Sequence, residues 1–498
     1  MSPLIARAPH AVPITPLDAQ NFRAWIGHAR SRTKSWVKAS GFAPRRGEVC
    51  IVRRPNGAVD RVLVGYAAED AHWAFAGLPD KLPKGQYRLD EAAPRAADLA
   101  SPLALGWALG TYRFGRYKKQ QATEAVLAWP PGVDRAEISR AIEAIFLVRD
   151  LVTTPAADMG PAQLATIATH LAERFGARGT VIEGDDLLKQ DFPLIHAVGR
   201  ASAKGARGTA RDRQPRLVDI RWGREGALKV TLVGKGVCFD SGGLNLKNEA
   251  GMKLMKKDMA GAAHVLALAL MIMDAGLDVR LRVLVPAVEN SVSGESMRPL
   301  DVVKSRKGLT VEIGNTDAEG RLILADALTE ASREKPDLLI DFATLTGAAR
   351  TALGPDVVAL FCNDDALAAD ILRHGQSLAD PLWRLPLWRN YRDGLESSVA
   401  DISSISESPY AGAITAALFL EAFVEEGIPW AHLDIMAWNV AARPGRPKGG
   451  EAMGLRAVYA LIAERAGSPG GTPKKKGGQP VVPRRKPKRP LRKRRRSR

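Results

Sequence analysis

The chain has 498 residues, which is longer than one ordinary domain and predicts two globular parts with extensions. Hydrophobic residues make up 46% and charged residues 25%, the balance of a globular protein with a sizeable core. The net charge is +18, but 14 Lys and Arg residues and no acidic residue lie in 468–498, so the rest of the chain carries only +4. The strong basicity therefore belongs to a tail and does not by itself indicate a nucleic-acid-binding body.

Targeting and redox features predict a cytoplasmic protein. Residues Met1–Gln20 contain no apolar h-region of a secretory signal. The longest strongly apolar stretch, Val265–Met273, is too short to cross a bilayer, so no membrane association is expected. Cys50, Cys238 and Cys362 stand far apart without a CxxC pair, which argues against disulfides or a thiolate zinc site and favours a reducing compartment.

The first part of the chain, residues 1–130, is predicted to form the smaller of two α/β domains. Short β-like runs such as Val49–Val52 and Ala125–Trp129 alternate there with polar connections that contain Pro and Gly. Apolar residues then recur at helical spacing over Asp134–Leu151, which predicts a connecting helix within 131–152.

The larger part, residues 153–467, is predicted to be a catalytic α/β domain with a mainly parallel central sheet. Helical stretches such as Met259–Ala275 and Leu322–Arg333 alternate with apolar runs of strand length, and this alternation is typical of a parallel sheet. The clearest strand-like runs are Lys229–Val233, Leu281–Val285, Leu338–Phe342 and Val357–Phe361. Ligands are expected beyond the carboxyl ends of such strands. The Lys-, Arg-, Pro- and Gly-rich tail, 468–498, is predicted to be disordered.

One acidic pair stands in the segment Asn315-Thr-Asp317-Ala-Glu319-Gly-Arg321-Leu. Asp317 and Glu319 are two residues apart, so both carboxylates would project to one side of an extended segment. Two bare carboxylates at that distance repel each other unless a cation lies between them. The alternative is that these acids only cap a helix that begins near Leu322, and this segment alone does not decide between the two.

Two further segments carry charged residues beside glycines. The first, Val233 to Lys247, holds Lys235, Asp240 and Lys247, and it lacks the GxxxxGK[ST] spacing of a phosphate-binding loop. Its glycines instead allow the backbone to turn tightly beside the charged side chains. The second, Met255-Lys-Lys-Asp258-Met, precedes an Ala-rich helix, so Asp258 alone would be read as a helix cap.

Taken together, the carboxylates favour a two-metal centre. Four negative charges would neutralise two divalent cations, which can hold a bridging hydroxide and clamp a carbonyl oxygen during its attack; the four residues are Asp240, Asp258, Asp317 and Glu319. Lys235 would add a neutral amine, since adjacent cations push the pKa of an amine down. Lys247 would stay charged and stabilise an oxyanion. Mostly hard oxygen ligands suit Mn²⁺ or Mg²⁺ and tolerate Zn²⁺.

These segments resemble the signatures of the leucyl aminopeptidase family, the two-metal cytosol aminopeptidases. The string Asn315–Leu322 is highly specific, and the other two segments stand in the family's order at appropriate distances. The resemblance covers about residues 140–465 and extends only loosely to the first 130. Further similar stretches are Asp341–Ala348, Tyr410–Ala417 and Trp430–Ile435.

The resemblance implies a role for each of eleven residues. Lys235, Asp240, Asp258 and Glu319 would hold one metal, and Asp240, Asp317 and Glu319 the other. Lys247 would polarise the scissile carbonyl, and Arg321 would bind a bicarbonate that acts as general base. Met255, Thr344 and Gly347 would line the pocket for the first side chain, and the Leu345 carbonyl would help to place the substrate. The resemblance further implies release of N-terminal, leucine-type residues from peptides whose free amine ligates a metal, and assembly as a homohexamer.

The sequence departs from the family near the expected rim of the pocket. Ile435 is followed by Met436-Ala-Trp438 where the family has an Ala-Gly step, and Met453-Gly-Leu-Arg456 replaces a usual Thr-Gly-Arg-Pro. The basic tail is not a family feature, and it supports a second hypothesis, binding of nucleic acid or another polyanion with peptidase activity secondary. A catalytically silent member is a third hypothesis, which the intact metal and catalytic positions argue against.

Overall fold

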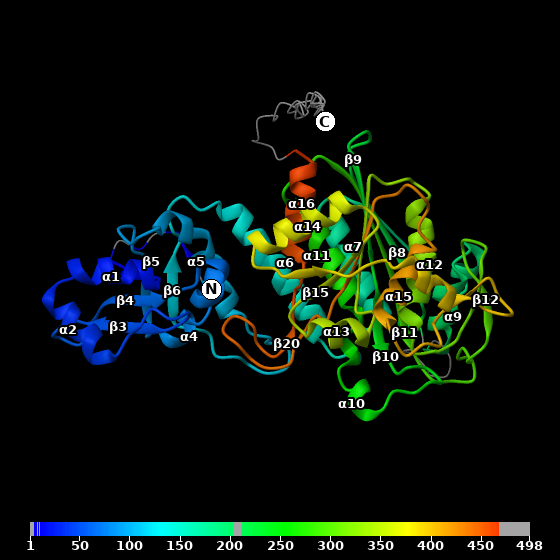
Figure 1. The fold of residues 1–498 in the computed structure, drawn as a ribbon, viewed down its shortest axis with the longest axis horizontal. Helices are drawn as coiled ribbons and strands as arrows, with labels where there is room; N and C mark the ends of the chain where they lie inside the picture. The colour runs from blue at the N-terminus through cyan, green and yellow to red at the C-terminus, as the bar shows by residue number, and fades with distance from the viewer. Residues whose placement is uncertain (1–3, 7, 9, 203–210, 468–498) are drawn as a thin grey trace, which may run out of the picture.

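The computed structural model describes residues 4–6, 8, 10–202 and 211–467; the predicted tail, 468–498, lies outside the described residues. Figure 1 shows two lobes, a smaller one formed by the first part of the chain and a larger one formed by the rest. Helix α6 (Arg135–Thr153) lies on the side of the larger lobe that faces the smaller one, and it is the helix predicted over Asp134–Leu151. The predicted α/β fold class is confirmed in both lobes.

The smaller lobe is built on a six-stranded sheet. All neighbouring strands are parallel except β3, which pairs antiparallel with β4. In sheet order the strands are β1 (Leu4–Ile5), β6 (Ala125–Ala128), β5 (Gly85–Leu89), β2 (Val12–Leu17), β4 (Val59–Gly65) and β3 (Val49–Arg53). The helices are α1 (Ala19–His28), α2 (Ser31–Ser40), α3 (Ala71–Phe75), α4 (Leu78–Lys81) and α5 (Ala96–Thr111). Buried aromatic rings, among them Phe75 and Trp107, fill the core between the sheet and α3 and α5.

The larger lobe contains a nine-stranded sheet whose central strands run parallel. In sheet order the nine strands are β16 (Leu382–Arg384), β15 (Val358–Cys362), β18 (Trp430–Asp434), β14 (Leu338–Ala343), β9 (Leu228–Gly234), β11 (Val279–Asn290), β8 (Arg216–Gly223) and β7 (Arg178–Glu183), with β10 (Gly236–Asp240) beside β11. The pairs β15–β18, β11–β8 and β8–β7 are antiparallel and the others parallel, so the sheet is mainly parallel, as predicted. The four predicted strands correspond to β9, β11, β14 and β15.

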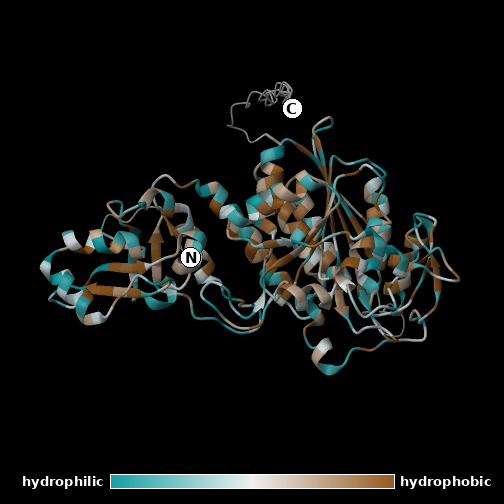
Figure 2. Ribbon diagram, viewed as in Figure 1, coloured by the Kyte–Doolittle hydropathy of each residue, from teal (hydrophilic) through white to brown (hydrophobic). Residues whose placement is uncertain are grey.

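Helices cover both faces of this sheet. One face packs against α6, α7 (Pro161–Arg174), α11 (Ala260–Asp274), α14 (Asp365–Ser377) and α16 (Leu455–Arg465), and the other against α9 (Pro193–Gly199), α12 (Glu319–Ser332) and α15 (Gly412–Glu421). Every residue of α11 up to Met273 is buried, as expected for a helix that is apolar all round. Figure 2 shows the same layering, with hydrophobic strands at the centre of each lobe and hydrophilic residues outside.

Short elements complete the larger lobe. They are α8 (Asp186–Lys189), α10 (Glu249–Met252), α13 (Gly347–Leu353), a small sheet of β12 (Val302–Lys304), β13 (Thr310–Glu312) and β17 (Ile402–Ser403), and the pair β19 (Trp438–Asn439) and β20 (Gly449–Gly450). The loop between β19 and β20 reaches the smaller lobe, where the Arg446 guanidinium lies 3.9 Å from the centre of the Trp73 ring. Over the described ranges, no helix combines the length and apolar character needed to cross a membrane.

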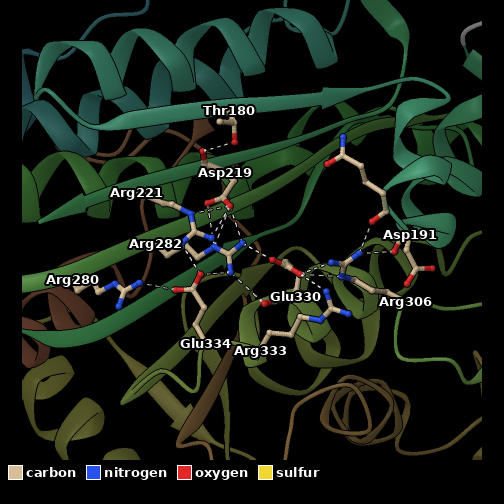
Figure 3. Close-up of polar contacts among 11 residues, drawn as sticks. Thr180, Asp191, Asp219, Arg221, Arg280, Arg282, Arg306, Glu330, Arg333 and Glu334 are labelled. Carbon is tan, nitrogen blue, oxygen red and sulfur yellow. Dashed lines mark hydrogen bonds and ion pairs between the residues drawn. The ribbon is translucent and has the colours of Figure 1, made fainter. Parts of the chain in front are cut away.

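A buried ionic network ties α12 to the sheet. Arg282 on β11 lies 2.8 Å from the Asp219 carboxylate on β8 and 2.7 Å from the Glu330 carboxylate near the end of α12. Arg306 binds the other oxygen of Glu330 at 2.5 Å, and Arg221 and Arg282 also meet Glu334 just beyond the helix (Figure 3). The network holds the carboxyl-terminal end of α12, whose first residue is Glu319.

Candidate metal and peptide site

The residues singled out by the sequence lie where parallel strands of the large sheet end. Lys235 follows β9 directly, Asp240 is the last residue of β10, and Thr344 follows β14. Neighbouring parallel strands end at the same edge of a sheet, so their terminal side chains converge there. This edge also receives Asn290, the last residue of β11, and Asp434, the last residue of β18.

The other three acids, Asp258, Asp317 and Glu319, lie at or near the starts of helices α11 and α12 but do not cap them. Ala318 occupies the cap position of α12 and Met259 that of α11, and neither helix start has a side-chain cap hydrogen bond. The capping alternatives for Asp317, Glu319 and Asp258 are therefore wrong. The prediction that Asp317 and Glu319 lie in an extended segment is also wrong, because Asp317 lies in a turn and Glu319 is the first residue of α12.

Lys235 sits between two buried carboxylates. Its Nζ lies 2.8 Å from Asp258 Oδ2 and 2.9 Å from Glu319 Oε1, and it donates to the Thr344 carbonyl at 3.0 Å. Burial by itself lowers the pKa of Lys235, but the Asp258 and Glu319 carboxylates raise it above its ordinary value. Gly320 makes room for this side chain, since a Cβ there would lie 2.5 Å from Lys235 Cε.

Lys247 forms a second bridge at the same edge. Its Nζ lies 2.8 Å from Asp240 Oδ2 and also pairs with Asp317 Oδ1. The loop that returns Lys247 to the site turns at Gly242 and Gly243, whose φ angles of +88° and +63° favour glycine. Burial by itself lowers the pKa of Lys247, but the neighbouring Asp240 and Asp317 carboxylates raise it above its ordinary value.

The donor set fits divalent metal ions. Carboxylate oxygens of Asp240, Asp317 and Glu319 all lie within 4.8 Å of one another. Glu319 Oε2 is buried without a hydrogen-bond partner among the described residues, so one oxygen of the cluster is available to a cation. Burial and the nearby Asp240 carboxylate raise the pKa of Glu319 well above its ordinary value. The negative charge of Glu319 is therefore unfavourable at this position, and bound cations would stabilise it.

A cavity opens beside these carboxylates. All predicted site residues except Arg321 line it, including the four proposed to contact substrate, Met255, Thr344, Leu345 and Gly347. The guanidinium of Arg321 is buried and donates to the Ser404 carbonyl at 2.7 Å, whereas its Nε has no hydrogen-bond partner among the described residues. Burial lowers the pKa of Arg321 to about 10.

Sequence reasoning missed three residues that the structure places at the site. Asn290 donates to Asp240 Oδ1 at 2.8 Å and so orients that carboxylate. Asp434 accepts hydrogen bonds from the backbone of Leu345 and Thr346 and thereby shapes the wall of the cavity. Lys257 lines the cavity, and burial lowers its pKa to about 8. Lys257 lies in the motif Met255–Met259 and Asp434 in the motif Trp430–Ile435, so their positions beside predicted site residues were the available signal. No local pattern marked Asn290.

The family models decide which class of protein this site belongs to. Residues 146–459 match the catalytic domain of the cytosol aminopeptidase family, and residues 12–130 match the N-terminal domain of M17 aminopeptidases. The chain belongs to the cytosol aminopeptidase family. It is accordingly a metal-dependent aminopeptidase of the leucyl type, as the sequence motifs predicted.

Individual relatives agree with this membership in the family. A probable cytosol aminopeptidase of Roseiflexus castenholzii is 40% identical over 394 residues, which is 76% of this chain and 78% of the relative. The crystal structure of the cytosol aminopeptidase from Coxiella burnetii has 48% identity and a TM-score of 0.88, covering 93% of this chain and 99% of its own. The bottromycin maturation enzyme BotP in complex with Mn has 35% identity and a TM-score of 0.80, covering 91% and 99%.

Proposed function

We propose that the chain removes single residues from the free amino end of peptides in the cytoplasm, with two divalent cations at the carboxylate cluster. The observation that carries the proposal is the convergence of Asp240, Asp317 and Glu319 beside a cavity that can receive a peptide end. Bound divalent cations supply Lewis-acid activation of water and of a peptide carbonyl at neutral pH. Mn²⁺ or Zn²⁺ are the proposed ions and Mg²⁺ is a third candidate; mostly hard oxygen ligands suit Mn²⁺ and Mg²⁺ and tolerate Zn²⁺.

The ligands divide between two positions. Lys235, Asp240, Asp258 and Glu319 would hold one ion, and Asp240, Asp317 and Glu319 the other. Support comes from the short contacts of Lys235 with Asp258 and Glu319, because one ion placed among these three groups would meet all of them. Such an ion would take over the carboxylates and lower the pKa of Lys235, so that the neutral amine becomes a ligand.

Two cationic side chains would act on the reacting groups. Lys247, held by Asp240 and Asp317, would donate to the carbonyl oxygen of the scissile bond as negative charge develops there. Arg321 would hold a bicarbonate ion at its unpaired Nε, beside the cluster, as a general base. The buried position of Arg321 excludes bulk water from that contact.

The first residue of the peptide would lie against Met255, Thr344 and Gly347, with the Leu345 carbonyl accepting from the substrate. Thr344 is fixed for this task because its Oγ1 donates to Asp258 Oδ1 at 2.7 Å. Asp434 fixes the backbone of Leu345 by accepting its N–H at 2.9 Å.

A hydrolysis assay with leucyl amide tests the proposal. Chelation should abolish turnover, and Mn²⁺ or Zn²⁺ should restore it. An N-acetylated leucyl peptide should resist cleavage, because acetylation removes the basic lone pair of the amine that a cation would bind. Full turnover in the presence of chelator, or equal cleavage of the N-acetylated peptide, would overturn the proposal of a two-metal exopeptidase.

Two further proposals concern assembly and the tail. The chain is proposed to form a homohexamer, which sedimentation can test. Its tail, 468–498, is proposed to bind RNA, DNA or another polyanion without sequence preference, since it carries 14 basic residues and no acid. A truncation ending at Gly467 should lose salt-dependent binding to duplex DNA and keep peptidase activity. Equal DNA affinity of both proteins would refute the role of the tail.

A further inference from the structure

Lys257 is a buried cation that neither the metal cluster nor the reaction uses. It lies in the 3₁₀ turn Met255–Met259, is only 3% exposed, and lines the same cavity as Met255 and Thr344. Its ammonium group makes no ion pair and donates no hydrogen bond to the described residues. Burial of an ammonium group without a partner is costly, so a retained one indicates a partner that arrives with the ligand.

The other lysines nearby are already engaged. Lys235 and Lys247 each pair with two carboxylates. Lys256, the adjacent residue in the same motif, donates to the Thr153 carbonyl at 2.5 Å and lies over the Trp438 ring. Over the described ranges, Lys257 is therefore the cavity lysine whose charge is not matched by direct contact.

No carboxylate among the described residues contacts the Lys257 ammonium; Asp258 and Asp434 raise its pKa only from a distance. Asp434 is the cavity carboxylate outside the proposed metal ligands, and its oxygens accept from Leu345 N, Thr346 N and Thr346 Oγ1. A second cation, Arg350 on α13, also lines the cavity; within the described part of the chain its guanidinium donates only to Met436 Sδ, at 3.7 Å. The cavity wall thus combines two cations that contact no carboxylate of the described residues with the apolar side chains of Ile435 and Met436.

We infer that this cavity accepts, besides apolar residues, an N-terminal residue with an acidic side chain, glutamate foremost, whose carboxylate binds Lys257. Arg350, which is exposed, adds a weaker attraction at the mouth. The apolar wall contacts the methylene stem, while the buried ammonium supplies a charge-assisted hydrogen bond that a neutral or basic side chain cannot match. The inference rests on the proposed function and names a substrate class for the same site.

The test compares kcat/KM of the Mn²⁺-loaded full-length enzyme for glutamyl, glutaminyl, leucyl and lysyl amides. Wild type should favour glutamyl over glutaminyl amide by about 10- to 100-fold, the range of one hydrogen bond to a charged group. Lysyl amide should be the poorest of the four. Lys257→Met should reduce the Glu/Gln ratio to near one, and Arg350→Gln should reduce it about two- to fivefold, as a partly screened charge would.

Lys256→Met is the matched control, since it removes a neighbouring lysine whose ammonium is engaged outside the cavity; it should keep the Glu/Gln ratio. Equal turnover of glutamyl and glutaminyl amides by wild type, or a ratio that survives Lys257→Met, would overturn the inference. The wild-type ratio decides the question even where a variant fails to fold. Absence of hydrolysis of all four amides would instead overturn the proposed function.

Discussion

Both lobes place acidic residues beyond the ends of parallel strands, but among the described residues only the larger lobe brings three of them close enough to share a metal ion. In the smaller lobe, Asp18 follows β2 and Asp90 follows β5. Asp18 caps α1 by accepting from Asn21 N at 2.7 Å and also accepts from the Tyr66 hydroxyl at 3.0 Å. Asp90 accepts from the Thr15 hydroxyl at 2.7 Å. Each acid stands alone and is satisfied by the protein.

In the larger lobe the acids converge on one another instead. Oxygens of Asp240, Asp317 and Glu319 lie within 4.8 Å of one another, and the nearest counter-charges are Lys235 and Lys247. A strand end therefore does not make a site by itself. A site forms where the fold holds several carboxylates close together without enough positive side chains to neutralise them. Such a cluster attracts cations.

The largest effect is expected from Asp258→Ala. This change removes one proposed ligand and leaves Lys235 with a single carboxylate contact, so metal occupancy should fall and kcat/KM for leucyl amide should drop by more than about 10³-fold. Metal analysis of the purified protein gives a readout independent of activity. Full occupancy by two ions in the variant would remove Asp258 from the ligand set.

Lys247→Ala and Arg321→Ala should differ from that variant in kind. Both should retain the metal ions, while loss of an oxyanion donor in Lys247→Ala lowers kcat by about 10²–10³-fold. Added bicarbonate should stimulate wild type and leave Arg321→Ala unchanged. Loss of both ions in Lys247→Ala would show that Lys247 is not merely a donor to the substrate.

Gly320→Ala tests the packing that brings Lys235 to the cluster. The added Cβ would lie 2.6 Å from Lys235 Nζ, so the amine must move and metal affinity should fall by about 10- to 100-fold, as for other groups that orient ligands. Gly27→Ala in α1 is the matched control, because nothing lies within 4 Å of a Cβ there. Equal metal affinity of the two variants would contradict the close approach.

The smallest effect is expected in the smaller lobe. Asp18→Ala removes the cap of α1 and should lower the free energy of unfolding by about 1 kcal/mol. Thermal unfolding measures this loss, and kcat/KM for leucyl amide should stay at the wild-type value. A large loss of activity in this variant would mean that the two lobes are coupled more tightly than their separate cores indicate.

The sequence predicted most of the fold where apolar runs were long. Strands β9, β11, β14 and β15 and helices α6 and α11 are buried along much of their length, so a continuous pattern marks them. The antiparallel strand β7 was not predicted, because it is largely exposed and has no strong apolar pattern. Helices of the smaller lobe were not predicted individually, since several are short and begin without a side-chain cap.

The site was predictable as a set of residues but not as a geometry. Asp317 and Glu319 were paired through an extended segment, whereas a turn and a helix start bring them together. Asn290 and Asp434 were missed because their roles arise from neighbouring strands, β11 and β18, that meet only in the folded sheet. The assigned chemical roles stay predictions that the variants above address.

The ionic network at the far end of α12 bears on how the enzyme responds to salt. The Debye length at physiological ionic strength is about 8 Å, and added salt weakens exposed charge pairs far more than buried ones. Arg282 is only 4% exposed, so its pairs with Asp219 and Glu330 persist in concentrated salt (Figure 3). The carboxyl-terminal end of the helix that presents Glu319 is thus anchored by charge pairs that salt screens only weakly, so ionic strength should disturb the position of this helix little.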